Sequence, residues 1–244
     1  DSNVSNTDGS ITSTVRANDT YGFSIISFSG TETSGATIGH GLSSAPDMII
    51  VKRRNSTSAW AVYHSELNGG TSPENYYLYL NATNAEAADS GFWNNTAPTS
   101  SVITLGNYNT VNGDGDPMIA YCWAEKTGYS KFGSYTSNTS TYPTITTGFR
   151  PAFVLLKNIT AGGTNWTIFD GTRNTTNTRD KRLAPNTSAA EGTEAQVNFT
   201  DTGFELTYVG DNNYNTDTII YAAFADTREA AFWLDQSGND NDWQ

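Results

Sequence analysis

Two stretches of the chain repeat one order of apolar and polar positions. Residues 46–64 have the sequence PDMIIVKRRNSTSAWAVYH, and residues 151–170 have the sequence PAFVLLKNITAGGTNWTIFD. In both, a proline precedes an apolar run that ends in a lysine, and a polar turn then leads to a tryptophan that opens a second apolar run. Short apolar runs bounded by turn residues are typical of buried β-strands. We therefore predict that each stretch contains two strands.

The repetition extends over most of the chain. The offset between matching positions stays between 100 and 107 residues, from FSIISFSG at 23–30 to MIAYCWAE at 118–125. The aligned pairs include Lys52 with Lys157, Trp60 with Trp166, Trp123 with Phe224, and Glu125 with Asp226. We predict two copies of one unit, at residues 22–126 and 129–227, whose shared positions serve core packing.

Each copy divides into about seven short strands separated by turn residues. In the first copy we expect strands at 23–29, 35–39, 47–54, 59–64, 76–81, 100–106 and 117–124. In the second copy we expect them at 131–136, 143–147, 152–158, 165–170, 196–200, 203–208 and 218–225. This strand density is typical of an antiparallel β-sandwich.

The composition also favours an all-β fold. Only 16% of residues are charged and 12% are aromatic, and the abundant Thr, Ser, Asn and Gly disfavour long helices. We predict two tandem, internally duplicated antiparallel β-sandwich units of jelly-roll-like type. The alternative, in which the copies are halves of one large sandwich, stays open. Two small sandwiches are favoured because each copy has its own tryptophan and its own closing apolar strand.

The two ends lie outside the repeats. Residues 1–21 lack apolar periodicity, so we expect an N-terminal linker or arm. Residues 228–244 contain AAFWL and then a turn rich in Gly, Asn and Asp, so we expect a strand that leads into a further module. Because the chain begins with Asp rather than Met, we expect it to be a piece of a longer protein.

The net charge of −12 narrows the choice of partners. Such a negative field repels phosphate backbones and anionic lipid surfaces, so we expect neither nucleic-acid binding nor adhesion to a membrane. No stretch approaches the roughly 18 apolar residues that a membrane span needs, so we expect no membrane insertion.

The sequence offers no convincing catalytic constellation, and we predict that the protein is not an enzyme. His40 and His64 have no nucleophile motif beside them, and the second copy replaces both, so packing is the favoured role. The glutamates form no paired pattern typical of sandwich glycosidases. The lone cysteine, Cys122, excludes an intramolecular disulfide, and its apolar neighbours indicate a small buried side chain.

Calcium is the single candidate cofactor. Asp114 and Asp116 lie in NGDGDP, and Asp211 and Asp217 lie in GDNNYNTD, just before the closing strand of each copy. Carboxylates at this spacing in a tight turn can supply the oxygen ligands that calcium prefers. The competing interpretation is that Asp, Asn and Gly are simply turn residues.

Aromatic residues in polar loops are candidates for binding sugar rings. Trp93, Tyr108, Tyr142 and Tyr214 lie in loops rich in Gly, Asn or Thr and could form a glycan platform. In the competing interpretation these rings anchor their loops to the core. Trp60 and Trp166 repeat between the copies and begin strands, so we predict that they are core residues.

Several sequence segments together resemble a known type of domain. The segments are GFSIISFSG, IGHGLSSAPDMIIVKRRNSTSAWAVYH, FWNNTAPTSSVITLG, AYCWAEKTGYSKFGSY, GFRPAFVLLK and YAAFAD. Over about residues 21–227 the chain resembles a tandem β-sandwich domain of bacteriophage tail-fibre and other virion structural proteins, especially of aquatic phages. The ending WLDQSGNDNDW resembles the beginning of a laminin-G or concanavalin-like module. The resemblance implies an oligomeric module at the virion surface and supplies no catalytic residues.

These observations together predict a non-enzymatic structural and adhesive module of a phage tail fibre or virion-surface appendage. The expected location is the virion surface or the extracellular space. The expected partners are further copies of the chain or other virion or filament proteins, with host-surface glycans as a candidate ligand. Two alternatives stay open: a subunit of a microbial extracellular filament or adhesin, and a carbohydrate-binding module or concanavalin-like glycan-active enzyme.

Overall fold

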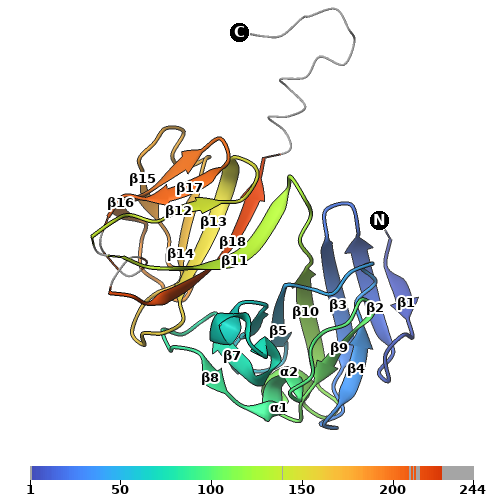
Figure 1. The fold of residues 1–244 in the computed structure, drawn as a ribbon. Coiled ribbons are helices and arrows are strands. Elements are labelled where there is room, and N and C mark those ends of the chain that lie inside the picture. The colour runs from blue at the N-terminus through green and yellow to red at the C-terminus, as the bar shows by residue number, and fades with distance from the viewer. Residues whose placement is uncertain (1, 139, 209, 211, 213–214, 227–244) are drawn as a thin grey trace, which may run out of the picture.

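The computed structural model describes residues 2–138, 140–208, 210, 212 and 215–226, and its regular structure is almost entirely β-strand (Figure 1). The helical elements are short: the 3₁₀-helices η1 (Leu67–Gly70) and η2 (Pro73–Asn75) and the α-helices α1 (Ser90–Trp93) and α2 (Asn109–Asn112). None of the helices in these residues has the length and apolar character that would let it cross a bilayer. The predicted all-β fold is confirmed.

The first sandwich is built on an eight-stranded antiparallel sheet. In spatial order its strands are β1 (Val4–Asn6), β2 (Ser13–Asn18), β3 (Phe23–Ser29), β10 (Pro117–Trp123), β5 (Met48–Arg53), β6 (Ala61–His64), β7 (Tyr76–Tyr79) and β8 (Ala87–Ala88). The second layer consists of the two-stranded sheet β4 (Ala36–Gly39) and β9 (Val102–Leu105) with α1 and α2. The core between the layers is closed by inward residues such as Ile26, Ile38, Ile49 and Ile103.

The prediction of a linker at residues 1–21 is wrong, because residues 4–6 and 13–18 form the strands β1 and β2 of the first sheet. β2 pairs with β3 from Thr14 opposite Ser27 to Asn18 opposite Phe23. Along β2 the buried Ser13 and Val15 alternate with exposed neighbours, as expected for a strand with one face on the core. The sequence pattern does not predict this strand, because Val15 is its one large apolar side chain.

The second sandwich consists of two four-stranded antiparallel sheets. One sheet has the order β11 (Ser130–Thr136), β18 (Thr218–Ala225), β13 (Pro151–Asn158) and β14 (Thr167–Asp170). The other has the order β12 (Thr144–Thr146), β17 (Gly203–Leu206), β16 (Gly192–Thr200) and β15 (Arg179–Arg182). Their facing sides enclose a core of their own, which includes Val154, Phe169, Phe199 and Phe204.

The two sandwiches share one strand order. The order β3-β10-β5-β6 in the first sheet corresponds to β11-β18-β13-β14 in the second, and β4-β9 corresponds to β12-β17. Every strand predicted from the sequence overlaps an observed strand. The predictions missed β1, β2, β8 and β15, which carry few apolar residues.

The repeated lysine follows each apolar run because it holds the next turn together. The Lys52 Nζ donates to backbone carbonyl oxygens of that turn, among them Ser56 at 2.6 Å. The Lys157 Nζ donates in the same way to the Thr164 carbonyl at 2.8 Å. An ammonium group has three donors, so one side chain can satisfy several carbonyls that strand pairing leaves over. This shared position therefore has a structural role.

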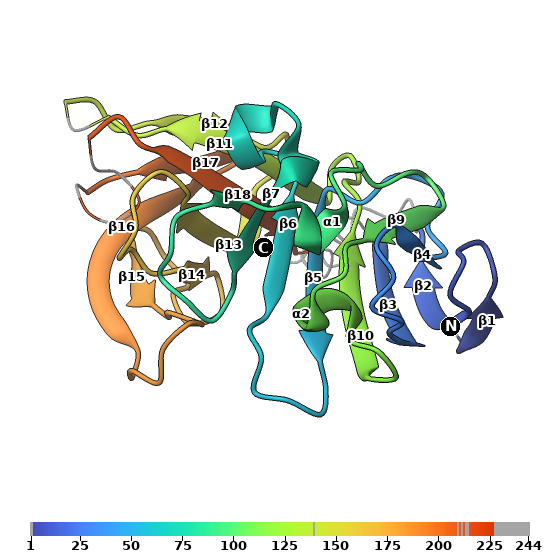
Figure 2. The same cartoon turned by 90° about the horizontal axis from the view of Figure 1, so that it is seen from below.

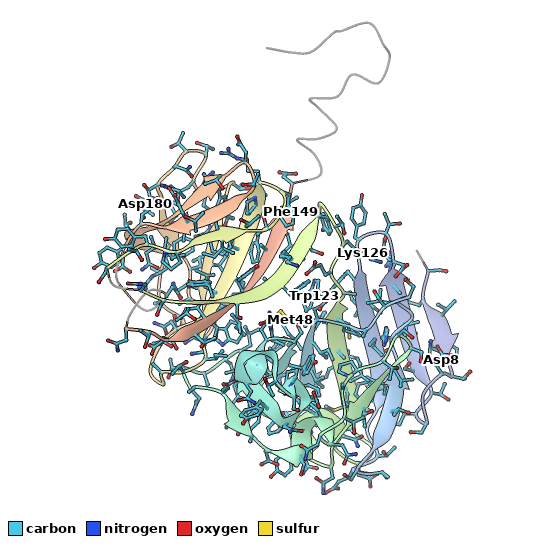
Figure 3. All side chains as sticks on the ribbon, viewed as in Figure 1. Asp8, Met48, Trp123, Lys126, Phe149 and Asp180 are labelled. Carbon is cyan, nitrogen blue, oxygen red and sulfur yellow. The ribbon has the colours of Figure 1, made fainter. Side chains whose placement is uncertain are left out.

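The two sandwiches contact each other through the outer faces of their equivalent sheets, and in Figure 2 β6 and β7 lie beside β13 and β18. We call the apolar cluster at this contact the junction core. It contains Met48, Ile50, Val62, Leu67 and Leu78 from the first sandwich and Phe132, Ile159, Trp166, Ile220 and Ala222 from the second. Figure 3 shows Met48 and Trp123 where the two halves meet.

Polar groups reinforce the junction core. The Trp166 Nε1 donates to the Tyr79 carbonyl at 2.9 Å, and the Lys157 Nζ donates to the Thr83 carbonyl at 3.3 Å. The predicted burial of the repeated tryptophans holds for Trp166 and partly for Trp60, which packs against the same cluster. Both lie at the contact between the sandwiches rather than inside either one.

Candidate binding site

Trp93, predicted as part of an exposed glycan platform, is a core residue. Its side chain is 2% exposed and makes an edge contact with Tyr63, with ring centroids 6.0 Å apart. The cause is local: Asp89 caps the single turn of α1 by accepting a hydrogen bond from the Gly91 N–H at 2.8 Å. This turn directs Phe92 and Trp93 into the first sandwich. The prediction for Trp93 is therefore wrong.

The other predicted platform residues have separate surroundings. The Tyr108 ring packs on Phe92 at a centroid distance of 5.3 Å, and its hydroxyl donates to Asp89 Oδ2 at 2.8 Å, so it anchors its loop. This hydrogen bond is the main reason why the pKa of Tyr108 is raised. Tyr142 is 52% exposed on the second sandwich. Tyr214 lies outside the described residues.

Asp116, a predicted calcium ligand, is paired with a protein cation. The Arg53 Nε lies 2.9 Å from its Oδ2. At the equivalent place in the second sandwich, Asp217 accepts a hydrogen bond from the Asn158 Nδ2 at 2.8 Å. Arg53 and Asn158 are aligned in the two copies, so the same strand end supplies the partner each time. These two carboxylates secure the start of the closing strand.

The remaining predicted calcium ligands do not complete a site. Asp114 is exposed in its turn, and Asp211 lies outside the described residues. In the part of the chain that the structure describes, no three His, Cys, Asp or Glu side chains gather as a metal site would require. The turn interpretation accounts for Asp114 and Asp116.

Both histidines are buried and hydrogen-bonded through both ring nitrogens. The Glu66 N–H donates to His64 Nδ1 at 3.1 Å, so Nε2 carries the proton and donates to the Tyr221 carbonyl of the other sandwich at 3.1 Å. His40 is held in the same way, with its Nε2 3.1 Å from the Thr99 carbonyl. Burial lowers the pKa of His64 to about 4 and also lowers the pKa of His40. Both rings are neutral packing residues.

An aromatic hollow lies at the rim of the junction core. It has a volume of about 450 Å³ and is lined by Asn18, Tyr21, Phe23, Trp123, Tyr129 and Phe224. Five of these six described lining residues are aromatic, and they come from both sandwiches. A concave apolar site with few polar groups is the usual form of a small-molecule pocket. We refer to this site below as the aromatic hollow.

Equivalent elements of the two copies build the aromatic hollow. Trp123 and Phe224 occupy aligned positions at the ends of β10 and β18. Tyr21 and Tyr129 lie just before β3 and β11, which pair with those two strands. Phe23 is directly opposite Trp123 in the sheet. The site therefore exists only where the two sandwiches meet.

The rings of the aromatic hollow are inclined to one another. Tyr21 and Tyr129 have centroids 5.0 Å apart and planes at 60°. Tyr129 and Phe224 are 6.1 Å apart at 64°, and Phe23 and Trp123 are 5.1 Å apart at 35°. Tyr21 is 42% exposed, and the other four rings are half-buried. Burial, and then the neighbouring Tyr21, raises the pKa of Tyr129.

Two lysines near the aromatic hollow are paired with carboxylates. The Lys126 Nζ lies 3.3 Å from Asp19 Oδ1, and the Lys131 Nζ lies 2.8 Å from Glu125 Oε1. The pKa of Asp19 is lowered, first by hydrogen bonds from Ser43 and then by Lys126. Figure 3 shows Lys126 on the connection between the two halves. These pairs neutralise the two lysines.

Some residues of this site are repeated in the sequence, where the repetition predicts core packing. Trp123 and Phe224 are aligned aromatic residues near the ends of the closing strands of the two copies. A tyrosine also precedes the first strand predicted in each copy. Their convergence depends on which faces of the two sandwiches come together. The repeat pattern alone does not contain that information.

Comparison with known proteins adds one match. Residues 1–228 match the model of a family described as a domain of unknown function, DUF7483. No curated protein and no solved structure matches the chain. The match spans both sandwiches, so the family's domain comprises both copies of the repeat.

Proposed function

The chain belongs to the DUF7483 family, and we propose that it is a non-enzymatic structural and adhesive module of a phage tail fibre or another virion-surface appendage. The observation that carries the proposal is the junction core, which joins two sandwiches of equal topology into one body. A fibre or appendage needs rigid units of this kind, because bending between its domains would move its tip out of place. The resemblance to virion structural proteins supports the same role.

The surroundings of the titratable side chains support a role without catalysis. His40 and His64 use both ring nitrogens in hydrogen bonds to the backbone, so neither is free to move a proton. Cys122 is fully buried, and burial raises the pKa of its thiol far above the usual range, so it is not a nucleophile. Asp116 is held by Arg53.

The surface also suits a module that works outside a cell. The net charge of −12 disfavours attachment to nucleic acid and to anionic membranes and keeps the protein in solution. The two sandwiches hold a large share of their backbone in hydrogen-bonded sheets, and backbone held in this way is protected from proteases. Self-association or contact with other appendage proteins would then extend the unit into a longer assembly.

Electron microscopy with gold-labelled antibodies tests the assignment. Antibodies raised against residues 1–228 are applied to the particle fraction of a culture that produces the full-length protein, with pre-immune serum as the control. We expect gold on the tails or surfaces of virions. Gold on filaments that have no capsids would instead assign the chain to a microbial filament or adhesin and would overturn the virion role.

A glycan array with the purified chain tests the carbohydrate alternatives. Trp93, which these alternatives would use to stack on a sugar ring, is buried in the first sandwich. We expect no polysaccharide to be cleaved on incubation with the protein. Release of reducing ends would contradict the non-enzymatic assignment.

A further inference from the structure

We propose that the aromatic hollow binds a quaternary ammonium group, such as the trimethylammonium head of a choline-type or betaine-type molecule. The proposal is independent of the virion role, because it concerns one pocket and its ligand chemistry. It rests on three properties of the hollow: its lining, the inclination of its rings, and the charge around it.

The lining suits a ligand that needs no hydrogen bonds. Asn18 is the one residue with an amide side chain among the described lining residues, and the rest of the wall is aromatic. A sugar that enters such a site loses water from several hydroxyl groups and finds few partners for them, which costs free energy. The methyl groups of a quaternary ammonium ion require no donors or acceptors, and its charge is attracted by the faces of aromatic rings.

The geometry suits a compact round group better than a flat one. Neighbouring rings of Tyr21, Tyr129 and Phe224 meet at 60° and 64°, so they form walls around a concave site and not one flat surface. A pyranose ring stacks best on a broad aromatic face, whereas a trimethylammonium group touches several inclined rings at once. The volume of about 450 Å³ lies within the range of small-molecule pockets.

The charge around the aromatic hollow favours a cation. None of the described lining residues is basic. The nearby Lys126 and Lys131 are neutralised by Asp19 and Glu125. The chain as a whole carries a net charge of −12, so its field attracts cations and repels anions. The same field disfavours acidic sugars as ligands.

Isothermal titration calorimetry of the full chain tests the proposal with three ligands at constant ionic strength. The first is choline chloride. The second is its neutral isostere dimethylbutanol, in which carbon replaces the charged nitrogen. The third is methyl glucoside. We expect choline to bind and the neutral isostere to bind at least several-fold more weakly, because the isostere keeps the shape and loses the charge.

Three variants locate the binding site. Tyr21→Leu keeps an apolar side chain but removes one ring, and we expect a loss of choline affinity of about two- to five-fold. Tyr21→Phe keeps the ring and should bind like the parent protein. Tyr142→Leu removes another exposed tyrosine, which lies outside the hollow, and should also bind like the parent. Circular dichroism melting curves verify that each variant is folded.

Each other outcome would overturn the proposal. Equal binding of choline and its neutral isostere would show that the hollow is simply apolar. Binding of methyl glucoside without choline would identify a sugar site. Choline binding that is unchanged in Tyr21→Leu would place the site elsewhere. Absence of choline binding at the highest soluble concentration would leave the hollow without this ligand.

Discussion

His64 gives the junction core a dependence on pH. It lies at the end of β6, is 1% exposed, and donates through Nε2 to the Tyr221 carbonyl of the second sandwich. Its ring also makes an edge contact with Phe132, with centroids 6.1 Å apart. Protonation would place an N–H on Nδ1, where it would face the Glu66 N–H, and the buried ring would become charged. The structure therefore holds the neutral ring.

The size of the effect follows from the pKa values. The pKa of His64 is about 4 in the folded protein, against an ordinary value of 6.5, because burial disfavours the charged form. Between these two pH values the unfolded chain binds more protons than the folded protein. The stability that the neutral His64 contributes is therefore fully present above about pH 6.5 and is lost as the pH falls towards 4. Between about pH 7.5 and 4.5 the loss from this one group is about 2.5 kcal/mol.

Urea unfolding of the parent and of His64→Gln at several pH values measures this loss. Glutamine does not titrate, and its amide nitrogen can still donate to the carbonyl that His64 contacts. Asp47, whose pKa burial raises, and His40 titrate in both proteins, so their contributions cancel in the difference. We expect the parent to lose about 2.5 kcal/mol more than the variant over this range. Parallel pH profiles for the two proteins would refute the reasoning.

Three further predictions follow from the same structure. Trp166→Phe removes the hydrogen bond between the sandwiches and should lower the free energy of unfolding in urea by about 1–3 kcal/mol, more than the matched Trp60→Phe, whose ring is less buried. Adding a calcium chelator should leave the melting temperature unchanged, because Asp116 already has a cationic partner; a fall in melting temperature would restore the calcium interpretation. Cys122 should react with a thiol reagent only after unfolding, and rapid labelling of the native protein would contradict its burial.

The strands that the sequence predicted share a strong local pattern. β5 and β13 are continuous apolar runs that end at a lysine, and turn residues bound them on both sides. The missed strands have no such pattern. β15 has the sequence RDKR. It forms a strand because it pairs with β16 and because the Arg179 guanidinium packs over the Phe199 ring at 4.8 Å. Tertiary contacts determine such strands, and local propensity does not.

The site residues were less predictable because their roles depend on distant partners. A loop tryptophan beside asparagines looks exposed, but one capped helical turn buries Trp93. Asp116 looks like a calcium ligand until Arg53, 63 positions earlier in the sequence, is brought to 2.9 Å by the pairing of β5 with β10. The aromatic hollow depends on the docking of the two copies, which no single segment specifies.

The contact between the sandwiches also affects how each half would behave alone. Some aligned positions, such as Ile50 and Leu155, take part on both sides, whereas Val62 belongs to the junction core and its counterpart Ile168 does not. The contact is therefore only partly symmetric. The copies have diverged at this contact as well, and His64 corresponds to Asp170. Either half produced alone would expose its apolar side of the junction core, and we expect it to self-associate through that surface.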